Sequence, residues 1–65
     1  MANVYVLYEG DDCVGVFGSY GEIARKLGVK QECAYLYATD EMKRMVRQHK
    51  RGWKKLRTVW REEVA

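Results

Sequence analysis

The sequence contains no proline, only two cysteines and one histidine, and no long apolar run. A single pair of cysteines is too few for a disulfide scaffold, so we expect both thiols to stay reduced, as they do in the cytoplasm. No stretch approaches the roughly 18 apolar residues of a membrane span, and residues 1–8 lack the basic start and the cleavage site of a secretory signal. We therefore expect a cytoplasmic chain with no membrane contact, folded as one domain over residues 1–65.

Residue types that carry catalysis or hold metals are scarce and dispersed. The only histidine, His49, shares a predicted apolar helix stripe with Met42 and Met45, where packing is its ordinary role. Cys13 and Cys33 form neither a C-x-x-C motif nor a zinc-ligand spacing. The six glycines make no phosphate-binding loop. The sequence thus predicts no enzyme, no metal site and no cofactor.

Basic residues are concentrated in the second half of the chain. The net charge is +3, but residues 1–40 carry three Lys or Arg against six Asp or Glu, whereas residues 41–65 carry nine against three. No acidic residue occurs between Lys43 and Arg61. Such a distribution is typical of proteins that bind a polyanion. The alternative is a basic face that is simply solvated.

Two short segments near the start have the composition of β-strands. Residues 3–8 and 13–17 are rich in valine and aromatic side chains, and residues 9–12 between them favour a turn. Both faces of the first segment are apolar, which predicts a central strand. A two-stranded hairpin is not stable by itself in water, so we expect it to pack on helices or to recruit a third strand.

Residues 19–39 predict two short helices joined by a tight turn. Ser19 and Glu22 have the S-x-x-E spacing of a capping box at a helix start. Apolar residues follow at helical spacing, and Gly28 stands where a helix commonly ends in left-handed backbone. The apolar and small positions of the pair are Ile23, Ala24, Leu27, Val29, Ala34 and Tyr37.

This spacing resembles the helix-turn-helix family of DNA-binding proteins. The resemblance covers about a third of the chain and includes the buried aliphatic positions, the turn glycine and two inward positions of the second helix. The residues that carry it are Ile23, Ala24, Leu27, Gly28, Val29, Ala34 and Tyr37. The order of motifs also resembles small proteins of phages and prophages of Gram-positive bacteria, which implies a bacterial or phage-infected host cell.

The second half leaves two alternatives open. Thr39 and Asp40 have the pattern of an N-cap and first turn, so a third helix begins there or the second helix continues, in either case until Gly52. Over residues 53–64, successive side chains alternate between an apolar face and a basic face, which favours a strand, although a helix also fits. We expect an α+β fold with an N-terminal β-hairpin, a helix-turn-helix, a basic helix and a C-terminal strand, a winged-helix-like small sheet.

The resemblance implies where DNA would bind. Residues 31–38 would enter the major groove as the recognition helix. The residues facing base edges would be Lys30, Gln31, Glu32 and Tyr35. Tyr35 is equally well explained as a core residue. Glu32 either contributes to sequence specificity or argues against placing this helix in the major groove. The residues on phosphates would be Lys43, Arg44, Arg47, Lys50, Arg51, Lys54 and Lys55.

The sequence-based hypothesis is therefore a phage-type transcriptional regulator that binds double-stranded DNA. One helix-turn-helix makes a small interface, so we expect a homodimer that spans two half-sites. The two copies would meet along the first strand or along the strand that contains Trp60. The alternative is a protein-interaction factor that binds and modulates a host protein, for example by inhibiting a nucleic-acid enzyme. RNA binding is a third alternative.

Overall fold

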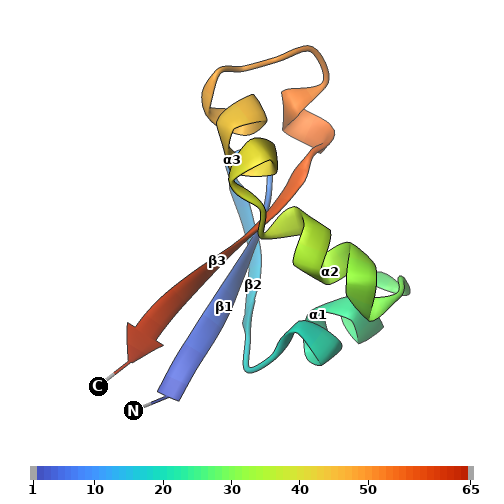
Figure 1. Cartoon of the computed structure of the whole chain (residues 1–65), viewed down its shortest axis with the longest axis vertical. Coiled ribbons are helices and arrows are strands. Elements are labelled where there is room, and N and C mark those ends of the chain that lie inside the picture. Colours follow the sequence, from blue (N-terminus) through green and yellow to red (C-terminus); the bar gives the residue numbers. More distant parts are fainter. Residues whose placement is uncertain (1, 65) are drawn as a thin grey trace.

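A three-stranded antiparallel sheet forms the centre of the structure, with three helices arranged along it (Figure 1). The structure is a computed structural model and describes residues 2–64. The expected α+β layout of a hairpin, helices and a closing strand is confirmed. The elements are β1 (Ala2–Glu9), β2 (Asp12–Phe17), α1 (Tyr20–Leu27), α2 (Gln31–Tyr37), α3 (Asp40–Arg47), the short 3-10 turn η1 (Trp53–Lys55) and β3 (Arg57–Val64).

β1 is the central strand, as its two apolar faces predict. The strand order is β2-β1-β3, and both pairings are antiparallel. Val6 of β1 lies opposite Val16 of β2 and opposite Trp60 of β3. β3 is thus the third strand that the hairpin needs for stability. Because Ala2 pairs with Val64, the two ends of the described chain lie together at one end of the sheet (Figure 1).

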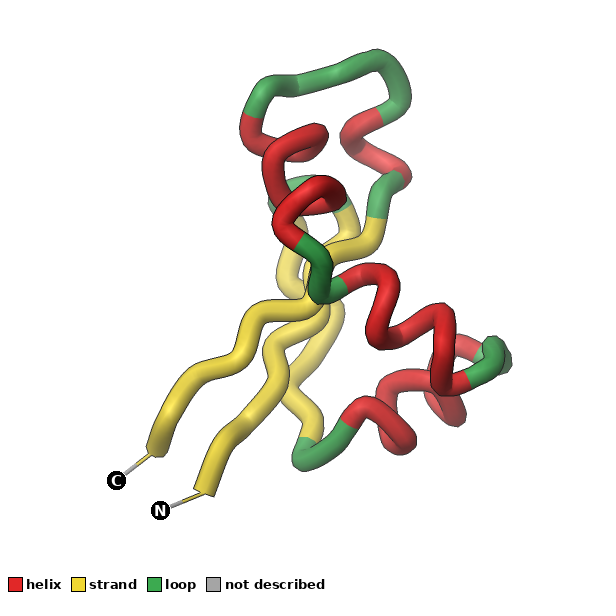
Figure 2. The backbone as a smooth tube through the Cα atoms, in the orientation of Figure 1, coloured by secondary structure: helices red, strands yellow, loops and turns green. Residues whose placement is uncertain are grey.

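The hydrophobic core lies between the sheet and the helix pair α1–α2. Leu7 of β1, Ile23 of α1 and Ala34 of α2 have no exposed surface, and Val59 of β3 is 1% exposed. The small side chain of Ala34 lets α2 pack closely on α1. Figure 2 shows these two helices beside the lower half of the sheet and α3 at its upper end.

α1 begins with the predicted capping box. The Ser19 hydroxyl accepts a hydrogen bond from the backbone N–H of Glu22 at 3.2 Å. The Glu22 carboxylate reaches back and accepts one from the backbone N–H of Gly18 at 2.6 Å. Two backbone donors near the helix start are therefore satisfied by side chains, and the carboxylate sits where the helix dipole favours negative charge.

Gly28 makes the turn between α1 and α2, as the sequence pattern predicts. Its backbone is left-handed, with φ of +69°. The backbone N–H of Val29 donates to the carbonyl of Ala24 at 3.0 Å, which closes the turn. A Cβ at Gly28 would meet no atom within 4 Å. The requirement for glycine is therefore one of backbone conformation and not of space.

We expect Gly28→Ala to lower the free energy of unfolding by about 1 kcal/mol, because an L-residue is strained in left-handed backbone. Gly21 offers a matched control, since it lies inside α1 and a Cβ there would meet its nearest atom at 3.7 Å. Gly21→Ala should raise the stability by roughly 0.5–1 kcal/mol. Urea denaturation of both variants measures the difference, and a change of the same sign in both would contradict this account of the turn.

α3 is a separate helix, which settles one alternative left open by the sequence. Thr39 is its N-cap, because the Thr39 hydroxyl accepts from the backbone N–H of Met42 at 3.4 Å. The same hydroxyl donates to the carbonyl of Leu36 at 2.8 Å, so one threonine links the end of α2 to the start of α3. The expected end of the basic helix at Gly52 is wrong, since α3 ends at Arg47.

Residues 48–52 give the physical reason for this early end. They contain no apolar side chain, so nothing would hold a longer helix against the sheet. His49 takes a positive φ of +52°. Its ring leaves the predicted apolar stripe and stacks on Trp53 at 4.2 Å between centroids. Residues 53–55 form the 3-10 turn η1, so the strand expected over 53–64 is confirmed only in the part that forms β3.

Candidate nucleic-acid interface

The start of α2 presents three of the four residues predicted to read bases. Lys30, Gln31 and Glu32 are exposed, whereas Ala34 on the inward side of the same helix is fully buried. Lys30 is the N-cap residue, and its side chain makes no capping hydrogen bond. The three side chains can therefore reach a ligand without any change in the fold.

Tyr35, the fourth predicted base-reading residue, connects this surface to the sheet. Its ring lies 4.7 Å from the ring of Tyr20, which in turn lies 4.5 Å from the ring of Tyr5 on β1. Half of the Tyr35 side chain is exposed, so this residue both packs against Tyr20 and can contact a ligand. The Tyr35 hydroxyl accepts a hydrogen bond from Gln31 Nε2 at 2.7 Å. The amide of Gln31 is therefore held in a defined orientation.

The seven residues predicted to bind phosphates lie at one end of the molecule. This end consists of α3, the loop 48–52 and η1, which occupy the top of Figure 1, while α1 and α2 lie below. Six of the seven are exposed, and Lys43 is half-buried. They are Lys43, Arg44 and Arg47 on α3, Lys50 and Arg51 in the loop, and Lys54 and Lys55 on η1.

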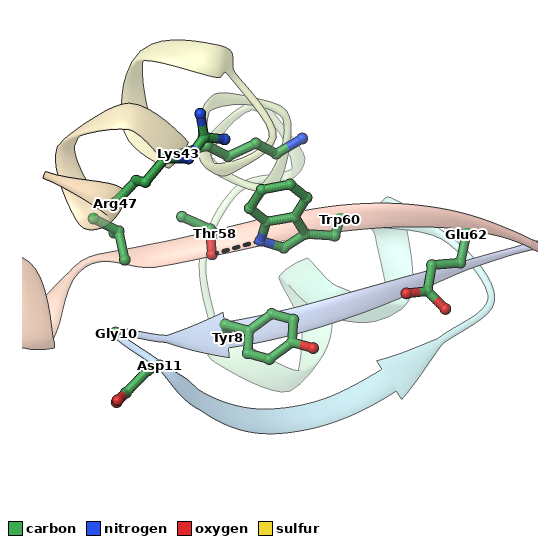
Figure 3. A pocket seen from close by; sticks show the side chains of 9 residues that line it. Tyr8, Gly10, Asp11, Lys43, Arg47, Thr58, Trp60 and Glu62 are labelled. Atoms are coloured by element: carbon green, nitrogen blue, oxygen red, sulfur yellow. Dashed lines mark hydrogen bonds between the residues drawn. The ribbon is translucent and has the colours of Figure 1, made fainter.

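A groove of about 450 Å³ lies between α3 and the sheet face opposite α1 and α2 (Figure 3). Two aromatic rings, two cations and two carboxylates line it. They are Tyr8 and Trp60, Lys43 and Arg47, and Asp11 and Glu62. The sequence did not predict this groove, because it needs the pairing of the first and last strands and the placement of α3 against them. The only sequence signal was the presence of aromatic residues in both strands.

The described residues contain no group of three or more His, Cys, Asp or Glu side chains placed to hold a metal ion. Between residues 2 and 64, no helix combines the length and the apolar character needed to cross a bilayer. Comparisons with protein-family models, with curated proteins and with solved structures found no match to this chain. Function is therefore inferred from the chain's own residues and their arrangement.

Proposed function

We propose that this chain is a sequence-specific DNA-binding protein, acting as a phage-type transcriptional regulator in the cytoplasm of a bacterial cell. The observation that carries the proposal is the outward face of α2. Lys30, Gln31 and Glu32 are exposed at the start of the helix, and Ala34 anchors the opposite side in the core. The major groove of B-DNA admits an α-helix, and helices of this kind contact bases with their N-terminal residues.

Gln31 is the best placed of these residues for reading a base. An amide offers one donor and one acceptor side by side, which matches N7 and the N6 amine of adenine. One N–H of Gln31 already donates to the Tyr35 hydroxyl, which leaves the second N–H and the carbonyl oxygen for adenine. Lys30 can donate to guanine, and Glu32 can accept from the amine of cytosine. Each residue therefore favours a different base.

The basic end of the molecule supplies contacts to phosphates. The molecule is 35 Å long, with α2 in one half and the α3–η1 end in the other. One turn of B-DNA is also about 34–36 Å long. A duplex that lies along this axis would meet α2 in the major groove and the basic end on the backbone less than one turn away. These phosphate contacts add affinity and fix the position of α2, but carry no base information.

A single copy offers only one short recognition helix, so the proposal includes a homodimer that reads two half-sites. Each copy would contact its own half-site, and the spacing of the half-sites would mirror the two-fold symmetry of the protein. Sedimentation equilibrium on the protein–duplex complex measures this directly. A stoichiometry of two chains for each site supports the dimer, and one chain for each site contradicts it.

Selection of bound duplexes from a random-sequence pool tests the proposed function. The wild-type chain should enrich a motif that contains adenine. We expect Gln31→Ala to lose discrimination at that position by about 1–3 kcal/mol, because the paired donor and acceptor are removed. Lys50→Gln is the matched control, since it removes an exposed charge of the basic end and should weaken all sequences alike. The same motif for wild type and Gln31→Ala would contradict the proposal.

A second candidate function is favoured by the exposed apolar residues. Leu36 on α2 and Val16 on the edge strand β2 are 56% and 61% exposed, so both side chains are accessible to a partner. Together with the basic end, they fit a host protein with an acidic surface, such as an enzyme that handles nucleic acid. The chain would then act as a modulator that uses the helix pair as a scaffold. Absence of duplex binding at low salt would favour this candidate.

A further inference from the structure

We propose that the groove between α3 and the sheet binds an unpaired nucleotide of a single-stranded nucleic acid. The base would pack against Trp60 and Tyr8, and its phosphate would lie on Lys43 and Arg47. The groove volume of about 450 Å³ falls within the range of roughly 300–1,000 Å³ for ligand sites in proteins. The groove shares Lys43 and Arg47 with the basic end, but its aromatic surface differs from the first turn of α2, so the proposal does not depend on base reading by α2.

The two aromatic rings form the apolar part of the groove. Tyr8 lies opposite Thr58, and Val6 lies opposite Trp60, so Tyr8 and Trp60 are diagonal neighbours on the same sheet face. Figure 3 shows both rings projecting into the groove. Aromatic side chains on an open sheet face provide stacking surfaces for unpaired bases, worth about 1–3 kcal/mol for each base.

Trp60 is held in place by the protein itself. Its indole N–H donates to the Thr58 hydroxyl at 3.1 Å, and Thr58 is only 1% exposed. The polar group of the indole is thus satisfied within the chain, and the ring offers its apolar surface to a ligand. Trp60 is 37% exposed, so part of the ring is accessible. A ring with a fixed orientation loses little conformational entropy when a base stacks on it.

The two cations are positioned for the phosphate of a stacked nucleotide. Lys43 and Arg47 are four residues apart on α3, so they lie on the same side of the helix. Lys43 Nζ lies over the Trp60 ring, 4.4 Å from its centroid, so a base that stacks on this face would displace the ammonium toward the phosphate of the same nucleotide. Lys43 is also the one half-buried cation among the seven of the basic end. Its ammonium is therefore better placed for a nucleotide in the groove than for an exposed duplex backbone.

One of the two carboxylates, that of Glu62, restricts which nucleotide fits. Asp11 lies in the turn between β1 and β2, and the Glu62 side chain follows Trp60 on the same face of β3. Figure 3 shows Glu62 on the side of the groove away from the cations and turned toward Tyr8, whereas the Asp11 carboxylate points away from both rings. Carboxylates repel phosphates and accept hydrogen bonds from base amines. We therefore expect bases with an exocyclic amine, such as cytosine or adenine, to bind better than thymine or uracil, which have none.

Tryptophan fluorescence of the Trp53→Phe variant tests the site, because Trp60 is then the only tryptophan. The probes are octamers of deoxycytidine, of thymidine and of cytidine. We expect deoxycytidine octamers to quench Trp60 and to bind about tenfold more tightly than thymidine octamers, the equivalent of about 1.4 kcal/mol. The cytidine octamer, compared with the deoxycytidine one, shows whether RNA or single-stranded DNA is preferred. Binding of all three octamers without quenching of Trp60 would overturn the proposal.

A pair of lysine variants separates the groove from general charge attraction. Lys43→Gln removes a cation inside the groove, and Lys54→Gln removes one from η1, outside it. By anisotropy of a labelled deoxycytidine octamer, we expect Lys43→Gln to weaken binding about fivefold and Lys54→Gln less than about twofold. Equal losses in the two variants would overturn the proposal. Failure of duplex binding, with Trp60 still quenched, would contradict only the proposed function.

Discussion

Leu7→Ala is expected to leave most of the protein unfolded at room temperature. Leu7 lies on the central strand, has no exposed surface and packs against α1, α2 and Val59. Truncating a buried leucine to alanine costs about 2–5 kcal/mol, through lost burial and the cavity left behind. A core in a chain below about 70–80 residues rarely supplies more than about 3–5 kcal/mol. Circular dichroism during urea titration measures the remaining stability.

Leu36→Ala is the matched control for this prediction. It makes the same chemical change, but Leu36 is 56% exposed on the outer side of α2. Leu36→Ala should change the free energy of unfolding by no more than about 0.5 kcal/mol, as most surface substitutions do. If the two variants lost equal stability, the core described here between the sheet and the helix pair would not be the one that stabilises the protein.

DNA binding should weaken about 500-fold when monovalent salt is raised from about 50 to about 200 mM. Each phosphate neutralised by a Lys or Arg releases condensed counterions, with a slope of about −0.9 in log K against log salt. If about five of the seven basic residues contact phosphates, the slope is about −4.5. Fluorescence anisotropy of a labelled duplex across several salt concentrations measures this slope.

Two arginine variants show which cations produce the slope. Arg51→Gln changes the loop of the basic end, and Arg61→Gln changes β3, outside the predicted phosphate contacts. We expect Arg51→Gln to reduce the slope by about 0.9 and Arg61→Gln to leave it unchanged, although both remove one positive charge. A reduction of the same size in both variants would show that net charge, and not the basic end, governs the binding.

The helix pair could be predicted because its signals depend on residues close together in the chain. Ser19 and Glu22 satisfy backbone donors within one helical turn, so their spacing is visible in the sequence. Gly28 is required by one backbone angle. The inward position of Ala34 follows from helical periodicity, and the structure places it in the core. The exposure of Lys30 and its neighbours follows from the same periodicity.

The features that depend on distant segments could not be predicted. The end of α3 at Arg47 is a different case, because the lack of apolar side chains in residues 48–52 is visible in the sequence and the expected end at Gly52 rested on the glycine alone. The mixed environment of Tyr35 depends on rings from two other elements. The groove depends on β1 pairing with β3, and on Lys43 reaching the ring of Trp60. Sequence periodicity contains none of these long-range relations.

The most direct measurement of the central claim is a map of backbone amide chemical shifts on addition of a duplex obtained from the selection. The account predicts the largest changes at Lys30–Tyr35, with smaller changes over residues 43–55. Large changes limited to β2 or to the sheet face of Trp60, with the start of α2 unaffected, would contradict it.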